Sequence, residues 1–180
     1  KMMLNISQIK AGGILLDPFC GSGTVLAEAL DLGVMNLIGT DLSAKAIRDT
    51  QENLNWLIKE FKLKPQQLVI KQLDARQLNQ DFANNSIDAI VSEPYLGQPI
   101  KGNEKDATIR KIVEELELLY LKSFEQFYKL LKNGSRAVIV IPEWHIGEKV
   151  IKMNIFEAIK KIGFTRLDEG NLIYKRGGQK

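Results

Sequence analysis

The chain has 180 residues, of which 44% are apolar and 26% charged, and a formal net charge of +3. This composition is typical of one globular domain with a substantial core, and no apolar stretch approaches the roughly 18 residues that would indicate a membrane span. Cys20 is the only cysteine and His145 the only histidine, so we expect no internal disulfide and no metal site. With a single cysteine and no secretory signal seen, a reducing, cytoplasmic setting is expected.

The positive charge is unevenly distributed. Residues 99–180 hold 16 Lys/Arg against 11 Asp/Glu, whereas residues 1–98 hold 9 against 11. The excess in the second half is compatible with a phosphate-rich partner, although a lysine-rich solvated surface is the simpler explanation of the charge alone. The chain begins at Lys1 and not at a methionine. We therefore expect residues 1–180 to form a single domain that is a fragment of a longer protein.

Short apolar runs alternate with amphipathic segments along the whole chain, a pattern typical of α/β proteins. The runs predict strands at 14–16, 36–41, 68–72, 86–92 and 137–141. The helical spacing of apolar residues predicts helices at about 23–32, from Ser43 to before Pro65, 108–132 and 149–162. Two further short strands, near 164–168 and 171–175, predict a hairpin. We therefore expect a doubly wound, Rossmann-like sheet of seven mostly parallel strands that ends in a C-terminal antiparallel hairpin.

The most informative segment is Asp17-Pro18-Phe19-Cys20-Gly21-Ser22-Gly23-Thr24, which joins the first predicted strand to the first predicted helix. Gly21 and Gly23 allow a sharp turn that a ligand can approach closely, and Ser22 or Thr24 can cap the helix. In open α/β sheets an acidic residue about 20 positions further on accepts hydrogen bonds from ribose hydroxyls. Asp41 ends the second predicted strand, 24 positions after Asp17. The turn and this acidic residue together predict a nucleotide-like ligand.

A second informative segment, Ser92-Glu93-Pro94-Tyr95, follows the fourth predicted strand. It places a hydroxyl, a carbonyl, a rigid proline and an aromatic face at the carboxyl edge of the sheet. In a doubly wound strand order this segment lies next to the glycine turn. The four groups suit a flat heterocycle that bears an amino group, and we expect the Tyr95 ring to stack on it.

Both segments resemble the motifs of a known enzyme class. Residues 17–24 (DPFCGSGT) resemble motif I, and residues 92–95 (SEPY) resemble motif IV, of class I S-adenosyl-L-methionine-dependent methyltransferases that methylate amino groups. Residues 1–7 (KMMLNIS) and 174–180 (YKRGGQK) extend the similarity over nearly the whole chain. These two segments make the resemblance closer still to the THUMP-associated, UPF0020-like RNA methylases, which modify the exocyclic N2 of guanosine in tRNA.

The resemblance implies a metal-independent transferase that uses S-adenosyl-L-methionine to methylate guanosine N2 in RNA, with tRNA as its partner. It also implies an upstream RNA-binding domain of the THUMP type and no membrane partner. The implied cofactor-binding residues are Asp17, Phe19, Gly21, Gly23, Thr24, Asp41, Leu42, Asp74 and Ala75, with Leu96 as a further apolar contact. In this set Asp41 would bind the ribose hydroxyls, and Asp74 would bind the adenine amino group. The implied catalytic residues are Ser92, Glu93, Pro94 and Tyr95.

Methyl transfer requires the acceptor nitrogen to lie in line with the sulfonium methyl group. Acceptors for its N–H groups would be Ser92 Oγ and the Glu93 carbonyl, while Tyr95 would stack on the base. The motif departs from the family, because Ser92 stands where the guanosine enzymes have aspartate and Glu93 stands where the motif has proline. A single carboxylate can accept both N1–H and N2–H of guanine, so we hypothesise that Glu93 replaces the missing aspartate. In the opposite interpretation the Glu93 side chain points to solvent and only its backbone acts.

Alternative functions remain open from the sequence. A DNA amino-methyltransferase, acting on adenine N6 or cytosine N4, would share both motifs, but the loop after Tyr95 is short for a target-recognition region. A protein amide methyltransferase would usually begin the second motif with asparagine. A cofactor-binding domain without methylating activity would also account for the altered SEPY. Outside the motifs, we expect Cys20 to be a packing residue and His145 to have no catalytic role.

Overall fold

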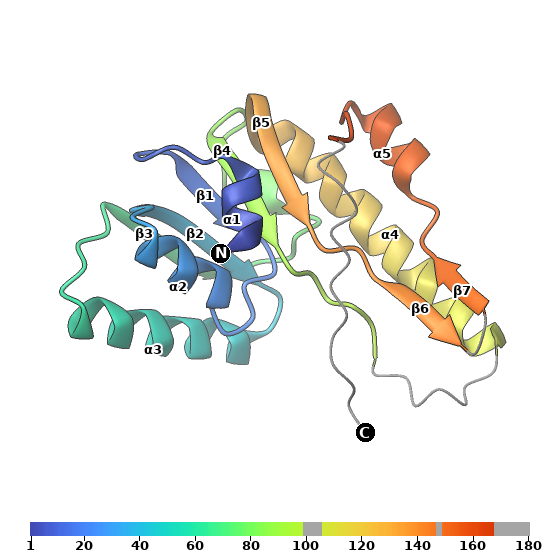
Figure 1. Ribbon diagram of the computed structural model, residues 1–180, viewed down its shortest axis with the longest axis horizontal. Helices are drawn as coiled ribbons and strands as arrows, with labels where there is room; N and C mark the ends of the chain where they lie inside the picture. Colours follow the sequence, from blue (N-terminus) through green and yellow to red (C-terminus); the bar gives the residue numbers. More distant parts are fainter. Residues whose placement is uncertain (99–105, 147–148, 168–180) are drawn as a thin grey trace.

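The computed structural model describes residues 1–98, 106–146 and 149–167, and a five-stranded sheet forms its centre (Figure 1). Neighbouring strands in this sheet are parallel and follow the order β3-β2-β1-β4-β5. The chain first moves outward from β1 to β3 and then returns to build the other half from β4. The strands are β1 Ile14–Asp17, β2 Asn36–Asp41, β3 Gln67–Gln72, β4 Ile87–Ser92 and β5 Leu131–Ile139. The carboxyl ends of β1 and β4 therefore flank the switch point at which such sheets bind ligands.

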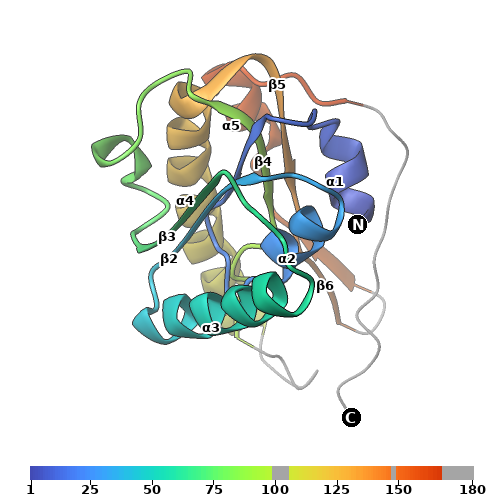
Figure 2. The same ribbon diagram turned by 90° about the vertical axis from the view of Figure 1, so that its left-hand side faces the viewer.

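Helices cover both faces of the sheet. They are α1 Met2–Ser7, α2 Thr24–Asp31, α3 Ala44–Glu60, α4 Asp106–Leu130 and α5 Phe156–Ile162, with a short 3₁₀ turn, η1, at Leu78–Gln80. Figure 2 shows α4 on one side of the sheet and α1 and α2 on the other. Within the described ranges, no helix combines the length and the apolar character needed to cross a bilayer.

The strands supply two hydrophobic cores because successive side chains point to opposite faces. Leu15 and Leu37 pack with residues of α1, α2 and α3, whereas Leu16 and Ile38 pack with residues of α4 and α5. All four are nearly or fully buried. The continuous apolar runs seen in the sequence are thus the signature of strands covered on both faces.

Local signals place some helix ends and not others. Ser43 caps α3 as expected, since its side chain accepts a hydrogen bond from the Ala46 N–H. The expectation that Ser22 or Thr24 caps α2 is wrong: the residue at the cap position is Gly23, and no side chain caps this helix. Gly23 has a φ of 88°, a left-handed conformation that favours glycine. The tight turn determines this helix start.

The sequence also predicts a helix over 149–162, and its first part is wrong. Strands β6 Glu143–Ile146 and β7 Lys149–Lys152 pair antiparallel in a separate two-stranded sheet. Ile151 has helical spacing to later isoleucines, yet it lies opposite the buried Trp144 in this pair. Cross-strand packing therefore outweighs the local period.

Within the described residues, five parallel strands form the main sheet and β6 and β7 form a separate hairpin, so the expected seven-stranded sheet is not confirmed. Residues 164–167, where one further strand was predicted, have no regular secondary structure. The other predicted strand, 171–175, lies outside the described residues. Among the described strands, β5 pairs with β4 along one edge.

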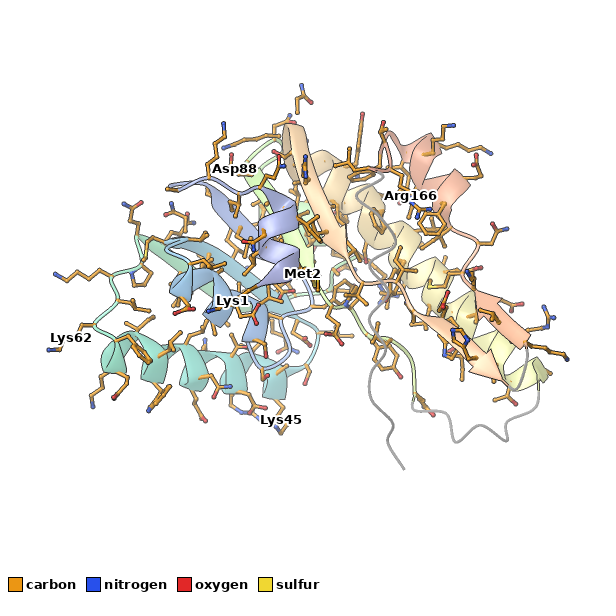
Figure 3. All side chains as sticks on the ribbon, in the orientation of Figure 1. Lys1, Met2, Lys45, Lys62, Asp88 and Arg166 are labelled. Carbon is orange, nitrogen blue, oxygen red and sulfur yellow. The ribbon has the colours of Figure 1, made fainter. Side chains whose placement is uncertain are left out.

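Asp88 stabilises the amino edge of the sheet, and Figure 3 labels it at the top of the molecule. Its carboxylate accepts hydrogen bonds from the Ile14 N–H at 2.9 Å and from Lys132 Nζ at 2.8 and 2.9 Å. Burial alone would raise the pKa of Asp88, but these two partners hold it below its ordinary value. The contacts of the Asp88 carboxylate are therefore structural.

Candidate functional site

Loops at the carboxyl edge of the sheet enclose a cavity of about 560 Å³. The loops follow β1, β2, β3 and β4, and Leu119 of α4 completes the wall. Six residues predicted to bind a cofactor line it: Phe19, Gly21, Asp41, Leu42, Asp74 and Ala75. Three residues of the predicted catalytic segment also line it: Glu93, Pro94 and Tyr95. Parallel strands bring their carboxyl ends together, so the two segments, far apart in sequence, share one cavity.

Asp41 holds the glycine turn in place. Its Oδ2 accepts a hydrogen bond from the Gly21 N–H at 3.0 Å, and its Oδ1 accepts one from the Ser43 N–H at 2.8 Å. A carboxylate has about four lone-pair sites, so each oxygen retains acceptor capacity. Asp41 is therefore both a structural anchor and an available acceptor on the cavity wall.

Two side chains of α3 fix the same turn. Thr50 Oγ1 donates to the Gly21 carbonyl at 2.8 Å, and Asn53 Nδ2 donates to the Ser22 carbonyl at 2.9 Å. A Cβ built on Gly21 would meet no atom within 4 Å, so the space beside this residue is open. The sequence reasoning missed Thr50 and Asn53, and the one available signal was their spacing of three residues, which places them on one helix face.

Asp17 and Ser92 connect the two motifs below the surface. Asp17 is 1% exposed and Ser92 is fully buried. Ser92 Oγ donates to Asp17 Oδ1 at 2.6 Å, and the Phe19 N–H donates to the same oxygen at 3.3 Å. Burial raises the pKa of Asp17 to about 7, although these two hydrogen bonds act in the opposite direction. Neither Asp17 nor Ser92 lines the cavity.

The turn that follows β4 is more open. Glu93 is exposed, Pro94 is buried, and the Tyr95 side chain is 54% exposed. The buried Tyr120 hydroxyl lies 3.4 Å from the Tyr95 carbonyl and can donate to it. Burial, together with the nearby Glu93 charge, raises the pKa of Tyr120, so its hydroxyl stays protonated. Tyr120 therefore supports the backbone of the turn, a role that the sequence pattern did not suggest.

Asp74 carries an arginine partner on the same wall. The Arg76 Nε lies 2.9 and 3.0 Å from the two Asp74 oxygens, and its Nη2 lies 2.5 Å from Oδ2. The Arg76 side chain holds the pKa of Asp74 below its ordinary value. Sequence reasoning singled out Asp74 and Ala75 here but missed Arg76 as a site residue.

The remaining predicted residues lie away from the wall. Gly23, Thr24 and Leu96 do not line the cavity. Cys20 is buried, and burial raises the pKa of its thiol to about 12, so the thiol is protonated at neutral pH. His145 lies on β6, where its Nε2 is 2.8 Å from Glu143 Oε1. In the part of the chain that the structure describes, no three His, Cys, Asp or Glu residues gather as a metal site would require.

Comparison with known proteins gives related sequences. Residues 1–167 match the UPF0020 family, described as RMKL-like, methyltransferase domain. A tRNA (guanine(10)-N2)-dimethyltransferase of Methanothermobacter thermautotrophicus is 32% identical over 152 residues, which cover 84% of this chain and 39% of that protein. A U6 snRNA (guanine-N(2))-methyltransferase THUMPD2 of Bos taurus is 27% identical, covering 79% of this chain and 25% of its own length. The chain therefore spans less than half of either relative.

Solved structures agree with the sequence match. TrmN from Thermus thermophilus superposes with a TM-score of 0.58 at 26% identity, and the match covers 77% of this chain and 36% of TrmN. The family match extends over both segments that meet at the cavity. The chain belongs to the UPF0020 family of RMKL-like methyltransferase domains.

Proposed function

We propose that this chain is the catalytic domain of an S-adenosyl-L-methionine-dependent enzyme that methylates the exocyclic N2 of guanosine in RNA. The observation that carries the proposal is the single cavity into which the glycine turn, Asp41 and the Glu93–Tyr95 turn all open. The relatives named above act on guanine N2 in tRNA or in U6 snRNA. Of these, tRNA is the proposed substrate, because the name of the more similar relative specifies it.

The residues of the cavity fit the cofactor. Asp41 has free acceptor capacity for two ribose hydroxyls, and charge-assisted bonds of this kind are about twice as strong as neutral ones. The open space beside Gly21 permits close approach of a ligand to the backbone. Asp74 and Leu42, on the same wall, would face the adenine. Once bound, the cofactor supplies an electrophilic methyl group on a positively charged sulfur.

Glu93 is the proposed acceptor for the N–H groups of guanine. The Ser92 side chain is buried and directs its hydroxyl to Asp17, whereas Glu93 is exposed and lines the cavity. Of the Ser92 and Glu93 side chains, only that of Glu93 is thus accessible from the cavity. By accepting from N1–H and N2–H it would orient the N2 lone pair toward the methyl group and stabilise the developing positive charge. Tyr95 would stack on the base, a contact typically worth about 1–3 kcal/mol.

RNA capture would require further protein. The chain covers 39% of the archaeal relative and 25% of the bovine one, so we propose that an upstream RNA-binding region belongs to the same polypeptide. The single-domain organisation of residues 1–180 and the cytoplasmic setting expected from the sequence are part of this proposal. Gly23 and Thr24 do not line the cavity, so we propose that they act on the cofactor only through the shape of the glycine turn.

We further propose that residues 171–175 add a strand to the sheet beside β5, which is the outermost strand on its side among the described residues. A groove of about 1300 Å³ runs along this edge, and Phe164 and Leu167 contribute to its wall. The run Asn171-Leu172-Ile173-Tyr174-Lys175 has strand-forming residues between Gly170 and Gly177. An unpaired edge exposes backbone donors and acceptors that another strand can satisfy. Deletion of residues 168–180 should then lower the unfolding midpoint and increase aggregation, and an unchanged midpoint would contradict this extension.

The function is tested with the full-length protein, labelled S-adenosyl-L-methionine and unmodified tRNA, followed by nucleoside analysis. We expect N2-methylguanosine as the labelled product, and Glu93→Gln should form it far more slowly. An exposed glutamate of α4, Glu114→Gln, is the matched control and should act as the unchanged protein does. Label found in DNA or in protein, and not in RNA, would overturn the proposal.

A further inference from the structure

The Arg76 side chain already binds the Asp74 carboxylate, which the proposed function assigns to binding of the adenine amino group. Asp74 Oδ1 accepts from the Arg76 backbone N–H at 2.9 Å and from its Nε at 2.9 Å. Asp74 Oδ2 accepts from the same Nε at 3.0 Å and from Nη2 at 2.5 Å. With about two lone-pair sites on each oxygen, little acceptor capacity is left. A ligand amino group can bind Asp74 fully only if the guanidinium gives up part of this contact.

The loop does not need the guanidinium to keep its shape. The Arg76 N–H already orients the Asp74 carboxylate, and the Gln77 N–H donates to the Asp74 carbonyl at 2.8 Å. Ala75 and Leu78 anchor the loop, since they are 4% and 0% exposed. The Arg76 side chain is 44% exposed, against 15% for Asp74, and ion pairs with such an exposed partner contribute little to stability. The guanidinium can therefore leave while the carboxylate remains in position.

We propose that Arg76 is a displaceable counter-ion that couples the two ligands of the cavity. In this proposal, which rests on the proposed function, the adenine amino group takes the acceptor site on Asp74 that the guanidinium held. The freed guanidinium then binds a phosphate of the RNA at the mouth of the cavity. Arg76 and Tyr95 line the same cavity, and a guanidinium is suited to bidentate recognition of phosphate.

The displacement has a thermodynamic consequence that a purely structural arginine lacks. A ligand that releases Arg76 must increase the affinity for RNA, and RNA must increase the affinity for that ligand by the same factor. The effect requires a donor at the purine 6-position. An analogue in which a hydrogen on carbon replaces the 6-amino group offers no hydrogen-bond donor on this edge of the purine, so it should leave the guanidinium in place.

The test measures binding and not turnover. Fluorescence anisotropy gives the tRNA affinity of the full-length protein with and without saturating S-adenosylhomocysteine at one fixed salt concentration. We expect S-adenosylhomocysteine to tighten tRNA binding about fivefold or more, within the usual range of coupling, whereas its analogue with unsubstituted purine in place of adenine should have no such effect. In Arg76→Ala the tightening should disappear, and S-adenosylhomocysteine should itself bind severalfold more tightly, because its competitor for Asp74 has been removed.

Arg110→Ala, which removes an exposed arginine of α4, is the charge-matched control. It can weaken tRNA binding, but it should leave the ratio between the two conditions unchanged. Weaker S-adenosylhomocysteine binding by Arg76→Ala, or coupling that survives in this variant, would overturn the inference. So would an unchanged protein that forms N2-methylguanosine yet shows no coupling, and this result would leave the proposed function intact. Equal unfolding midpoints of the variants exclude misfolding as the cause.

Discussion

The two halves of the cavity are built differently. On the side of β1 and β2, the Asp41 side chain accepts a hydrogen bond from the glycine turn, and the Thr50 and Asn53 side chains donate to it, so its backbone is held in place. On the side of β4, the Glu93 and Tyr95 side chains are exposed, and one hydroxyl supports the turn from below. The first half is therefore pre-organised for one small ligand, whereas the second is open to a large partner. Pre-organisation lowers the cost of binding, while an open turn leaves room for an extruded base.

The largest expected effect is on stability and concerns Asp17, the buried carboxyl group between the two halves of the cavity. Its folded pKa of about 7 lies above the ordinary value of 3.8. The contribution of protonated Asp17 to the free energy of unfolding is therefore complete below about pH 4. It is lost as the pH rises from this value through 7, and the total loss is up to about 4 kcal/mol for such a pKa shift. We expect urea unfolding from pH 4 to 8 to show this slope for the unchanged protein relative to Asp17→Asn. A stability difference that stays constant over this range would show that Asp17 is not protonated in the fold.

Glu93 tests the open half. Glu93→Gln replaces the charged group that we propose as the acceptor for guanine N–H groups by a neutral amide, and we expect kcat to fall by about 10²–10³-fold, as for other groups that stabilise developing charge. Since Glu93 lies on the acceptor side, the affinity for S-adenosylhomocysteine should be unchanged by calorimetry. Loss of cofactor affinity with normal kcat would place this residue in the other half.

Asp41 tests the pre-organised half in the same way. In Asp41→Asn the charged acceptor is lost, and the Gly21 and Ser43 N–H groups lose part of their anchor. We expect S-adenosylhomocysteine to bind about 10–100-fold more weakly, the equivalent of one or two charge-assisted hydrogen bonds. The tRNA affinity measured without cofactor should be retained. Equal loss of both affinities would contradict the division into halves.

Two substitutions of Tyr95 distinguish the contribution of ring stacking from that of hydrogen bonding in the open half of the cavity. Tyr95→Ala should raise KM for tRNA about tenfold, consistent with a base–aromatic contact of about 1–3 kcal/mol. Tyr95→Phe retains the ring and should behave as the unchanged enzyme in steady-state kinetics. If Phe were as damaging as Ala, the hydroxyl and not the ring would be the important group.

Thr50 gives the smallest expected effect. Thr50→Val keeps the shape of the side chain and removes the hydrogen bond to the Gly21 carbonyl, so we expect a loss of about 1 kcal/mol in the free energy of unfolding. Cofactor affinity should fall only severalfold, because Asp41 still holds the turn. Glu52→Gln on the exposed side of α3 is the control and should change neither quantity. An intact cofactor affinity in Thr50→Val would show that Asp41 and Asn53 are sufficient to fix the turn.

Much of the fold could be predicted because its signals are local. The buried runs of β1, β2 and β4 and the Ser43 cap of α3 all follow from short stretches of sequence. The spacing of the glycine turn and Asp41 also predicted that they lie together at one edge of the sheet, where Gly21 and Asp41 line the same cavity. Local patterns failed where long-range pairing decided the outcome, as at Ile151, whose helical spacing is overridden by its partner Trp144.

The sequence by itself determined that two motifs meet at one edge of a parallel α/β sheet, because strand direction fixes where the carboxyl ends lie. Only the tertiary structure decided which atoms face the cavity. It turned Ser92 inward to Asp17 and left Glu93 on the wall, and it placed Arg76 on the carboxylate of Asp74. Adjacent residues in a chain can face opposite environments, and packing against distant residues determines which environment each side chain meets.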